Sequence, residues 1–212
     1  MIISIEGNIG SGKSTIFNFL KNILSKNDFY FVDEPVEEWL KIRDEKENII
    51  EKFYKNQKKY AFSFQMMAYI SRLKNLQEAI KNNPNKIIIT ERNIMTDKNI
   101  FAKMLYHQKK IDEINYKIYN QWFNYFLQDL PIIKYIYIRT NPLICAERII
   151  KRNRKGEKIS LEYLNDCHQY HENWFEKEDK IVIKTDNDFI NDFEILNNIR
   201  EKILDFKKEK FL

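Results

Sequence analysis

The sequence predicts a doubly wound α/β fold, in which helices cover both faces of a five-stranded parallel sheet. Two observations predict it. Five short apolar segments, rich in β-branched and aromatic residues, lack the polar alternation of half-exposed strands. Between them lie longer segments with apolar residues at helical spacing. Alternating elements of this kind are typical of parallel sheets with right-handed crossovers.

The expected elements follow in chain order. The strands are Ile2–Glu6, Tyr30–Asp33, Lys86–Thr90, Ile133–Arg139 and Ile181–Lys184. The helical segments are Ser14–Ser25, Lys46–Asn83, Ile94–Tyr106, Asp112–Leu130, Pro142–Arg152, Leu161–Glu176 and Phe189–Lys207. The first residue of the helix Pro142–Arg152 is indicated by its sequence, because Asn141 is a good N-cap and Pro142 suits the first helical position.

Length and composition exclude several classes of protein. A chain of 212 residues predicts one domain, residues 1–212, and 43% hydrophobic residues exclude a disordered chain. No apolar run approaches the roughly 18–20 residues of a membrane span. Two cysteines, Cys145 and Cys167, cannot form a disulfide framework or a four-ligand zinc site, so we expect a reducing, intracellular setting.

The charge balance favours a small anionic ligand over a nucleic acid. The net charge is +5, and the only short basic cluster is Lys151–Lys155. The first residues, Met1–Ile5, already resemble a buried strand and leave no room for a leader, so we expect the cytoplasm or the cytosol of an infected cell.

A complete P-loop motif follows the first expected strand. The segment from Gly7 to Ser14, GNIGSGKS, fits G-x-x-x-x-G-K-[ST], and a helical pattern comes directly after it. Its glycines let backbone N–H groups turn towards phosphate oxygens, and the helix N-terminus adds its positive dipole end. Lys13 is expected to reach the β- and γ-phosphates of ATP, and Ser14 to bind Mg²⁺. The motif leaves open what accepts the phosphate.

Charged residues follow two other expected strands, at the edge of the sheet where the P-loop lies. Glu34, held extended by Pro35, could take a proton from an attacking hydroxyl. Arg92 could point at the transferring phosphate or the acceptor oxygen, and Glu91 could hold the metal directly or through water. A surface carboxylate and an ordinary ion pair are the alternatives.

Three arginines form a further basic element. Arg148 and Arg152 are four residues apart on one expected helix face, and Arg154 follows. Beside a triphosphate they would neutralise the charge that develops during transfer. A solvated helix end, favoured by the helix dipole, is the alternative.

The motifs together resemble the cellular deoxynucleoside kinases, the group of the deoxycytidine, deoxyguanosine and mitochondrial-type thymidine kinases. The resemblance runs from about residue 3 to residue 174 and continues more weakly to the end. The motifs that carry it are GNIGSGKST, EPVEEW, FSFQ with a following SR, ERN with a following D and FA, YIRTNP, RIIKRNR, and LEYL with a following HxxHENW.

The resemblance implies a P-loop kinase fold, a lid at about residues 148–160, and roles for individual residues. Glu34 matches the general base for the 5′-hydroxyl, Arg92 an arginine near that hydroxyl, and Glu91 the acid associated with Mg²⁺. The matching ATP-binding residues are Gly7, Asn8, Ile9, Gly10, Ser11, Gly12, Lys13, Ser14, Thr15, Arg148, Arg152, Arg154 and Asp186. The matching nucleoside-binding residues are Trp39, Phe64 and Phe101 at the base faces, Gln65 at the base edge, Arg72 and Asp97 beside it, and Tyr54 and Glu157 at the 3′-hydroxyl. The segment Asp186–Asp188 matches the loop near the donor adenine, and a homodimer built through helices is implied.

The resemblance also bears on base preference. Members with the pair that corresponds to Arg72 and Asp97, and with Ala68, favour deoxycytidine or purine deoxynucleosides. Members that favour thymidine have smaller or apolar residues there. We therefore expect deoxycytidine or a purine deoxynucleoside to be preferred, with a broad-specificity or thymidine-preferring enzyme as the alternative within the family.

The sequence departs from the family pattern at four places. Asn93 replaces a usual Ser, Asn153 a usual Gly and Ser160 a usual Pro, and the lid is about one residue shorter after Glu157.

Two other classes of function compete with a nucleoside kinase. A nucleotide kinase of the thymidylate type shares the P-loop and the lid, but Glu34 would then face an anionic acceptor, at an electrostatic cost. A nucleotide-binding module without catalysis would have no use for a base such as Glu34.

Overall fold

The computed structural model describes residues 1–127, 130–154, 157–186 and 193–210. Its centre is a five-stranded sheet whose paired strands all run parallel, in the order β2-β3-β1-β4-β5. The strands are β1 (Ile2–Gly7), β2 (Phe29–Val32), β3 (Ile87–Glu91), β4 (Ile133–Arg139) and β5 (Lys180–Lys184). The sheet expected from the sequence is therefore confirmed.

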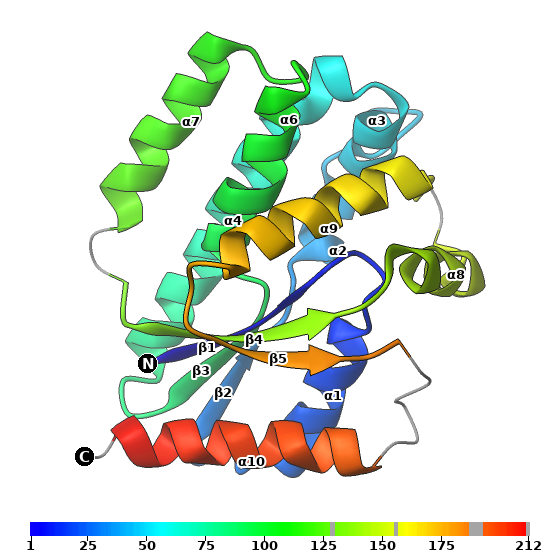
Figure 1. The fold of residues 1–212 in the computed structure, drawn as a ribbon. Helices are drawn as coiled ribbons and strands as arrows, with labels where there is room; N and C mark the ends of the chain where they lie inside the picture. The colour runs from blue at the N-terminus through cyan, green and yellow to red at the C-terminus, as the bar shows by residue number, and fades with distance from the viewer. Residues whose placement is uncertain (128–129, 155–156, 187–192, 211–212) are drawn as a thin grey trace.

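Helices cover both faces of this sheet (Figure 1). The α-helices are α1 (Lys13–Ile23), α2 (Val36–Lys41), α3 (Ile49–Lys55), α4 (Gln57–Asn82), α5 (Ile94–Thr96), α6 (Lys103–His107), α7 (Glu113–Phe126), α8 (Pro142–Arg152), α9 (Leu161–Phe175) and α10 (Phe193–Lys210). A π-helical turn, η1 (Asp97–Ala102), joins α5 to α6. None of the described helices is long and apolar enough to cross a membrane.

The core has one layer on each side of the sheet. Ile3 and Ile5 of β1 face α1 and α10, where they pack with Phe17, Leu20 and Ile203. Ile2 of β1 faces the opposite side and packs against Leu76 and Ala79 of α4. Because side chains alternate along a strand, burial on both faces explains why the strands are continuously apolar.

Most expected elements agree with the structure to within two residues at each end. The expected helix Asp112–Leu130 corresponds to α7, which ends at Phe126, and the expected helix Phe189–Lys207 corresponds to α10, which ends three residues later, at Lys210. The expected helix Lys46–Asn83 is two helices, α3 and α4, because the chain turns at Asn56 (φ −148°, ψ 80°), whose side chain caps α4. Helix α2 was not expected. The first residues of the expected helix Phe189–Lys207, residues 189–192, lie outside the described part of the chain.

The topology brings the chemistry-bearing loops to one edge. Strands β1, β3 and β2 are neighbours and parallel, so their carboxyl ends lie together. The P-loop follows β1, Glu34 follows β2 after one intervening residue, and Arg92 follows β3 directly. A ligand crevice at the carboxyl ends of the strands is the rule for open α/β sheets.

Candidate active site

A cavity of about 600 Å³ opens at this edge of the sheet. It is lined by the P-loop, the segments after β2 and β3, helices α3 and α4, η1, α8 and α9. Every described residue expected from the sequence to bind ATP, nucleoside or metal lines this cavity, except Gly7, Asn8 and Ser11, which are buried. The structure therefore brings the expected residues together, although it holds no ligand that would test their roles.

The P-loop has the backbone conformation that its glycines permit. Gly7, Gly10 and Gly12 all have positive φ, and a Cβ atom on Gly7 would lie 2.5 Å from the carbonyl oxygen of Ile138. Lys13 begins helix α1, and its Nζ donates a hydrogen bond to the carbonyl oxygen of Asn8 at 2.6 Å. Asn8 in turn donates to the carbonyl oxygen of Leu164, which connects the P-loop to α9.

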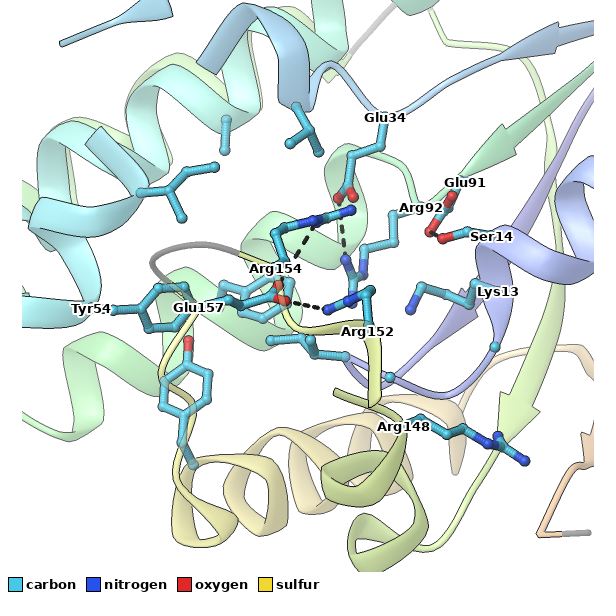
Figure 2. A pocket seen from close by; sticks show the side chains of 18 of the residues that line it. Lys13, Ser14, Glu34, Tyr54, Glu91, Arg92, Arg148, Arg152, Arg154 and Glu157 are labelled. Carbon is cyan, nitrogen blue, oxygen red and sulfur yellow. Dashed lines mark hydrogen bonds and ion pairs between the residues drawn. The ribbon is translucent and has the colours of Figure 1, made fainter. Parts of the chain in front are cut away.

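Glu34 lies across the cavity from the P-loop and is held by two arginines. Its Oε1 lies 3.1 Å from Nη1 of Arg92 and pairs with Nη2 of Arg72 (Figure 2 shows Glu34 beside Arg92). Arg92 has a positive φ of 58°, which is uncommon for a residue with a side chain, and its Nη2 donates to the carbonyl oxygen of Gly7 at 3.3 Å. A strained residue that joins the base candidate to the P-loop is typical of a functional site.

Ser14 and Glu91 point toward one another beside Lys13 (Figure 2). The hydroxyl of Ser14 donates to Oε1 of Glu91 at 2.8 Å. Hydroxyl and carboxylate oxygens are the ligands that Mg²⁺ prefers, and this metal usually keeps phosphate oxygens and waters as its other ligands. In the described part of the chain, no cluster of three or more His, Cys, Asp or Glu could hold a metal ion without such additional ligands. The two side chains therefore fit a metal that arrives with a nucleotide.

Aromatic side chains enclose the end of the cavity opposite to the P-loop. Phe64 lies edge-on to Trp39, with ring centroids 5.8 Å apart, and stacks on Phe53 at 4.5 Å. The Nε1 of Trp39 donates to Ser71 at 2.8 Å, which fixes the indole. The side-chain amide of Gln65 is buried, and its Oε1 has no hydrogen-bond partner among the described residues. An unpaired carbonyl oxygen that lines the cavity can accept a hydrogen bond from the edge of a planar polar ligand.

The three arginines expected in the lid differ in what they contact. Arg152 and Arg154 both pair with Glu157, through Nη2 and Nη1 at 2.5 and 3.7 Å (dashed lines in Figure 2). Arg148 points away from them and donates to the carbonyl oxygens of Ser11 and Thr185. Glu157 was expected at the nucleoside 3′-hydroxyl, and the arginines were expected at the donor phosphates. The ion pairs therefore connect a residue expected to bind the nucleoside with residues expected to bind the donor.

The donor-side loop is described only in part. Asp186 lines the cavity, and its Oδ1 accepts a hydrogen bond from the backbone N–H of Asn141 at 2.7 Å. Residues 187 and 188 of the expected adenine loop, and residues 155 and 156 of the expected lid, lie outside the described residues.

Burial and neighbouring charges shift the pKa values of three groups in the cavity. Burial would raise the pKa of Glu34, but the guanidinium groups of Arg72 and Arg92 lower it to about 2. Burial and the charge of Arg92 lower the pKa of Lys13 to about 7. Burial raises the pKa of Asp97 to about 6, against the opposing effect of Arg72. Glu34 is thus ionised at neutral pH and can accept a proton, and Lys13 gains charge most readily when an anion approaches.

Sequence reasoning did not identify several residues that line the cavity. Phe53, Ile50 and Tyr163 carry only the apolar or aromatic periodicity of core residues, so no local signal separates them from the core. Helix α8 adds Ile144, Glu147 and Lys151. Lys151 belongs to the basic cluster expected to favour an anionic ligand, whereas Glu147 lies one helical turn before it and carries no signal of its own.

The chain matches a known family. The family model of deoxynucleoside kinases matches residues 3–210, and the chain belongs to this family. It is similar to a probable deoxycytidine kinase of Fowlpox virus (strain NVSL), with 36% identity that covers 99% of this chain and 89% of that protein. It is similar to the deoxycytidine kinase of Homo sapiens, with 33% identity over 92% of this chain and 81% of that protein. A mitochondrial deoxyguanosine kinase of Xenopus laevis is 30% identical over 82% of this chain and 73% of its own length.

Membership of the family settles the general reaction. The protein is a deoxynucleoside kinase, an ATP-dependent phosphotransferase with a P-loop and a five-stranded parallel sheet. The family named from the sequence is therefore confirmed, as are the fold class and the enzyme class.

Proposed function

We propose that this kinase transfers the γ-phosphate of Mg²⁺-bound ATP to the 5′-hydroxyl of deoxycytidine or a purine deoxynucleoside, for nucleotide salvage. The observation that carries the proposal is the position of Glu34, which faces the P-loop across the cavity and is held there by Arg72 and Arg92. An ionised carboxylate at this point can take the proton from a neutral hydroxyl.

The neighbouring residues supply positioning and charge. Lys13 and the backbone of the P-loop hold the donor phosphates, and Arg92 neutralises the oxygen charge that develops beside Glu34. Ser14 and Glu91 would hold Mg²⁺, which supplies charge neutralisation at the phosphates when it is bound. Arg152 and Arg154 reach the cavity from the lid and would approach the donor once a ligand occupies Glu157.

The nucleoside occupies the aromatic end in this proposal. Its base lies between the rings of Trp39, Phe64 and Phe101 with its edge on Gln65, and its 3′-hydroxyl meets Tyr54 and Glu157. The buried Arg72–Asp97 pair, whose Nε and Oδ2 atoms lie 3.2 Å apart, offers charged partners to a base amino or carbonyl group and none to a thymine methyl. The relatives, whose printed names are deoxycytidine and deoxyguanosine kinases, support the same preference.

The assembly is a homodimer in this proposal, formed through the exposed face of α7. Five large hydrophobic side chains lie at helical spacing on that face: Ile114, Ile118, Trp122, Tyr125 and Phe126. A stripe of this kind is unusual on a monomer and typical of an interface. The single kinase domain over residues 1–212, with its lid at about 148–160, and its place in the cytoplasm remain predictions.

A phosphate-transfer assay tests the proposal. Purified protein is incubated with ATP, Mg²⁺ and each of the four deoxynucleosides, with dTMP as an alternative acceptor. We expect a 5′-monophosphate from deoxycytidine or a purine deoxynucleoside. Thymidine as the preferred acceptor would contradict the argument from Arg72 and Asp97, and transfer to dTMP alone would contradict the role of Glu34. Omission of Mg²⁺ is expected to abolish transfer with every acceptor.

A further inference from the structure

Arg72 contacts two carboxylates that belong to different parts of the site. Its Nη2 pairs with Oε1 of Glu34, and its Nε lies 3.2 Å from Oδ2 of Asp97. The same guanidinium also donates through Nη1 to the carbonyl oxygen of Glu91 at 3.4 Å. One side chain on α4 therefore connects the segment after β2, the end of β3 and the π-helical turn η1.

The environment of Arg72 makes this arrangement rigid. The side chain is 6% exposed, and its Cζ lies 5.0 Å from the ring centroid of Trp39, which Ser71 fixes from the same helix. The donors of a guanidinium lie in one plane and point in fixed directions. Two carboxylates that pair with different nitrogens of the same guanidinium are therefore held in a fixed position relative to each other. Arg72 cannot turn away from Glu34 without breaking its contact with Asp97.

The charges around Glu34 come from four elements. Arg72 faces it from α4, Arg92 from the end of β3, Lys13 from the start of α1, and Asp97 from η1. Three of these groups are cationic and favour the ionised carboxylate, and Asp97 opposes them. Arg72 is the cation that pairs with Glu34, and it also partly neutralises Asp97. Loss of Arg72 therefore removes a favourable charge and exposes Glu34 to more of the Asp97 charge, and both effects raise the pKa of Glu34.

We infer that Arg72 is a positioning residue for the chemical step: it holds the Glu34 carboxylate ionised and oriented toward the 5′-hydroxyl, in addition to its contact at the base. The inference rests on the proposed role of Glu34 as the base. Its consequence is that base selection and proton transfer share one side chain. A base that engages the Arg72–Asp97 pair acts on the same guanidinium that fixes Glu34, so base identity affects kcat as well as KM.

The test compares variants that separate charge from the base contact. R72M removes the charge, R72K keeps it, and D97N removes only the partner at the base end. R72M leaves the buried Asp97 carboxylate without its partner and could fail to fold. The double variant R72M/D97N has no such unpaired carboxylate and is measured as well for this reason. For each, kcat at saturating deoxycytidine is measured against pH, and Glu34 is titrated by carboxyl ¹³C NMR of glutamate-labelled protein, with E34Q to assign the signal.

The inference predicts a pKa of Glu34 that rises by about 1–3 units in R72M, because an adjacent cation is lost. In the double variant the pKa also rises, but by less, because the opposing charge of Asp97 is lost as well. The acid limb of kcat moves up by the same amount, and kcat on the plateau falls by about tenfold to a hundredfold as the carboxylate loses its orientation. In R72K the Glu34 pKa stays close to that of the wild type, and in D97N it does not rise, because the charge that opposes ionisation of Glu34 is lost. Base preference changes in both variants.

Two results would separate the possible failures. An unmoved Glu34 signal in R72M and in the double variant, with E34Q inactive, would overturn the inference and leave the proposed function intact. An E34Q protein that keeps its activity would overturn the proposed role of Glu34 itself.

Discussion

Four charged side chains, Lys13, Glu34, Arg72 and Arg92, set the chemistry of the site at the residue scale; the three cations are buried and Glu34 is 16% exposed. Buried charges are costly unless they are paired, and Arg72 and Arg92 share Glu34, whereas Lys13 donates to a backbone carbonyl oxygen. The lowered pKa of Lys13, about 7, is the direct result of burial beside Arg92. A polyanionic donor relieves this repulsion, so the cavity is prepared for phosphate before any ligand enters.

Binding of ATP is expected to weaken as the pH rises from about 7 to about 9, by tenfold or more. The protonated form of Lys13 binds phosphate, its pKa in the free protein is about 7, and bound phosphate raises that pKa. Calorimetry in two buffers of different ionisation enthalpy will show uptake of a proton near the upper end of this range. K13R, whose guanidinium stays charged, is the control and should lose this pH dependence. Equal affinities across the range in the wild type, without proton uptake, would contradict the shift.

At the scale of elements, short helices and turns position the cavity walls. Helix α3 brings Phe53 and Tyr54 to the aromatic end of the cavity. It begins with a capping box, in which Asn48 accepts from the backbone N–H groups of Ile50 and Glu51. The π-helical turn η1 carries Asp97 and Phe101, both buried against the cavity. Such turns occur mostly at functional sites, because they change which side chains share a helix face.

Loss of the cap of α3 is expected to reduce both stability and nucleoside binding. N48A leaves the first N–H groups of the helix without their acceptor and should lower the free energy of unfolding by about 1 kcal/mol. Because α3 carries Tyr54, KM for the nucleoside should rise more than KM for ATP. Urea unfolding and steady-state kinetics measure the two effects. N48D keeps an acceptor oxygen and should match the wild type; an equal loss in both variants would show that the cap is not the cause.

The sequence predicted the elements where one local signal dominates. Continuous apolar runs located all five strands, and Asn141-Pro142 marked the first residue of α8. Helix α2 was missed because its six residues follow a proline and carry no side-chain cap. The break between α3 and α4 was missed because both sides continue the same helical pattern. In the site, the positions of the P-loop and of Glu34 at the cavity could be predicted from the motif and from the order of the strands. The positions of Phe53 and Tyr163 at the cavity could be recognised only in the tertiary structure.

At the scale of the whole molecule, the parallel sheet gathers the site at one edge and leaves other surfaces free for assembly. Helix α7 lies at the periphery, on the opposite side of the molecule from α8 (Figure 1), and none of its residues lines the cavity. Its inner face buries Tyr119 and Phe123, and its outer face exposes Trp122 and Tyr125, at 46% and 65%. The outer face would be covered in the proposed homodimer without closing the active site.

A charge in the α7 stripe is expected to convert the dimer to a monomer. W122K places an ammonium group at the centre of the apolar face, which an interface cannot bury without a partner charge. Analytical ultracentrifugation of the wild type and the variant gives the mass directly. I150K is the matched control, because Ile150 is 76% exposed on α8, outside the stripe. A wild-type protein that sediments as a monomer would contradict the assembly.

The central claim is that Glu34 takes the proton from the nucleoside 5′-hydroxyl, and the most direct measurement is the single-turnover rate of phosphate transfer to deoxycytidine by E34Q. The amide keeps the size of the side chain and cannot accept the proton, so we expect the rate to fall by about 10²–10⁴-fold while both substrates still bind. D33N is the control, since Asp33 is exposed and pairs with Lys21 outside the cavity, and its rate should equal that of the wild type. An E34Q rate within about tenfold of the wild type would contradict general-base catalysis by Glu34.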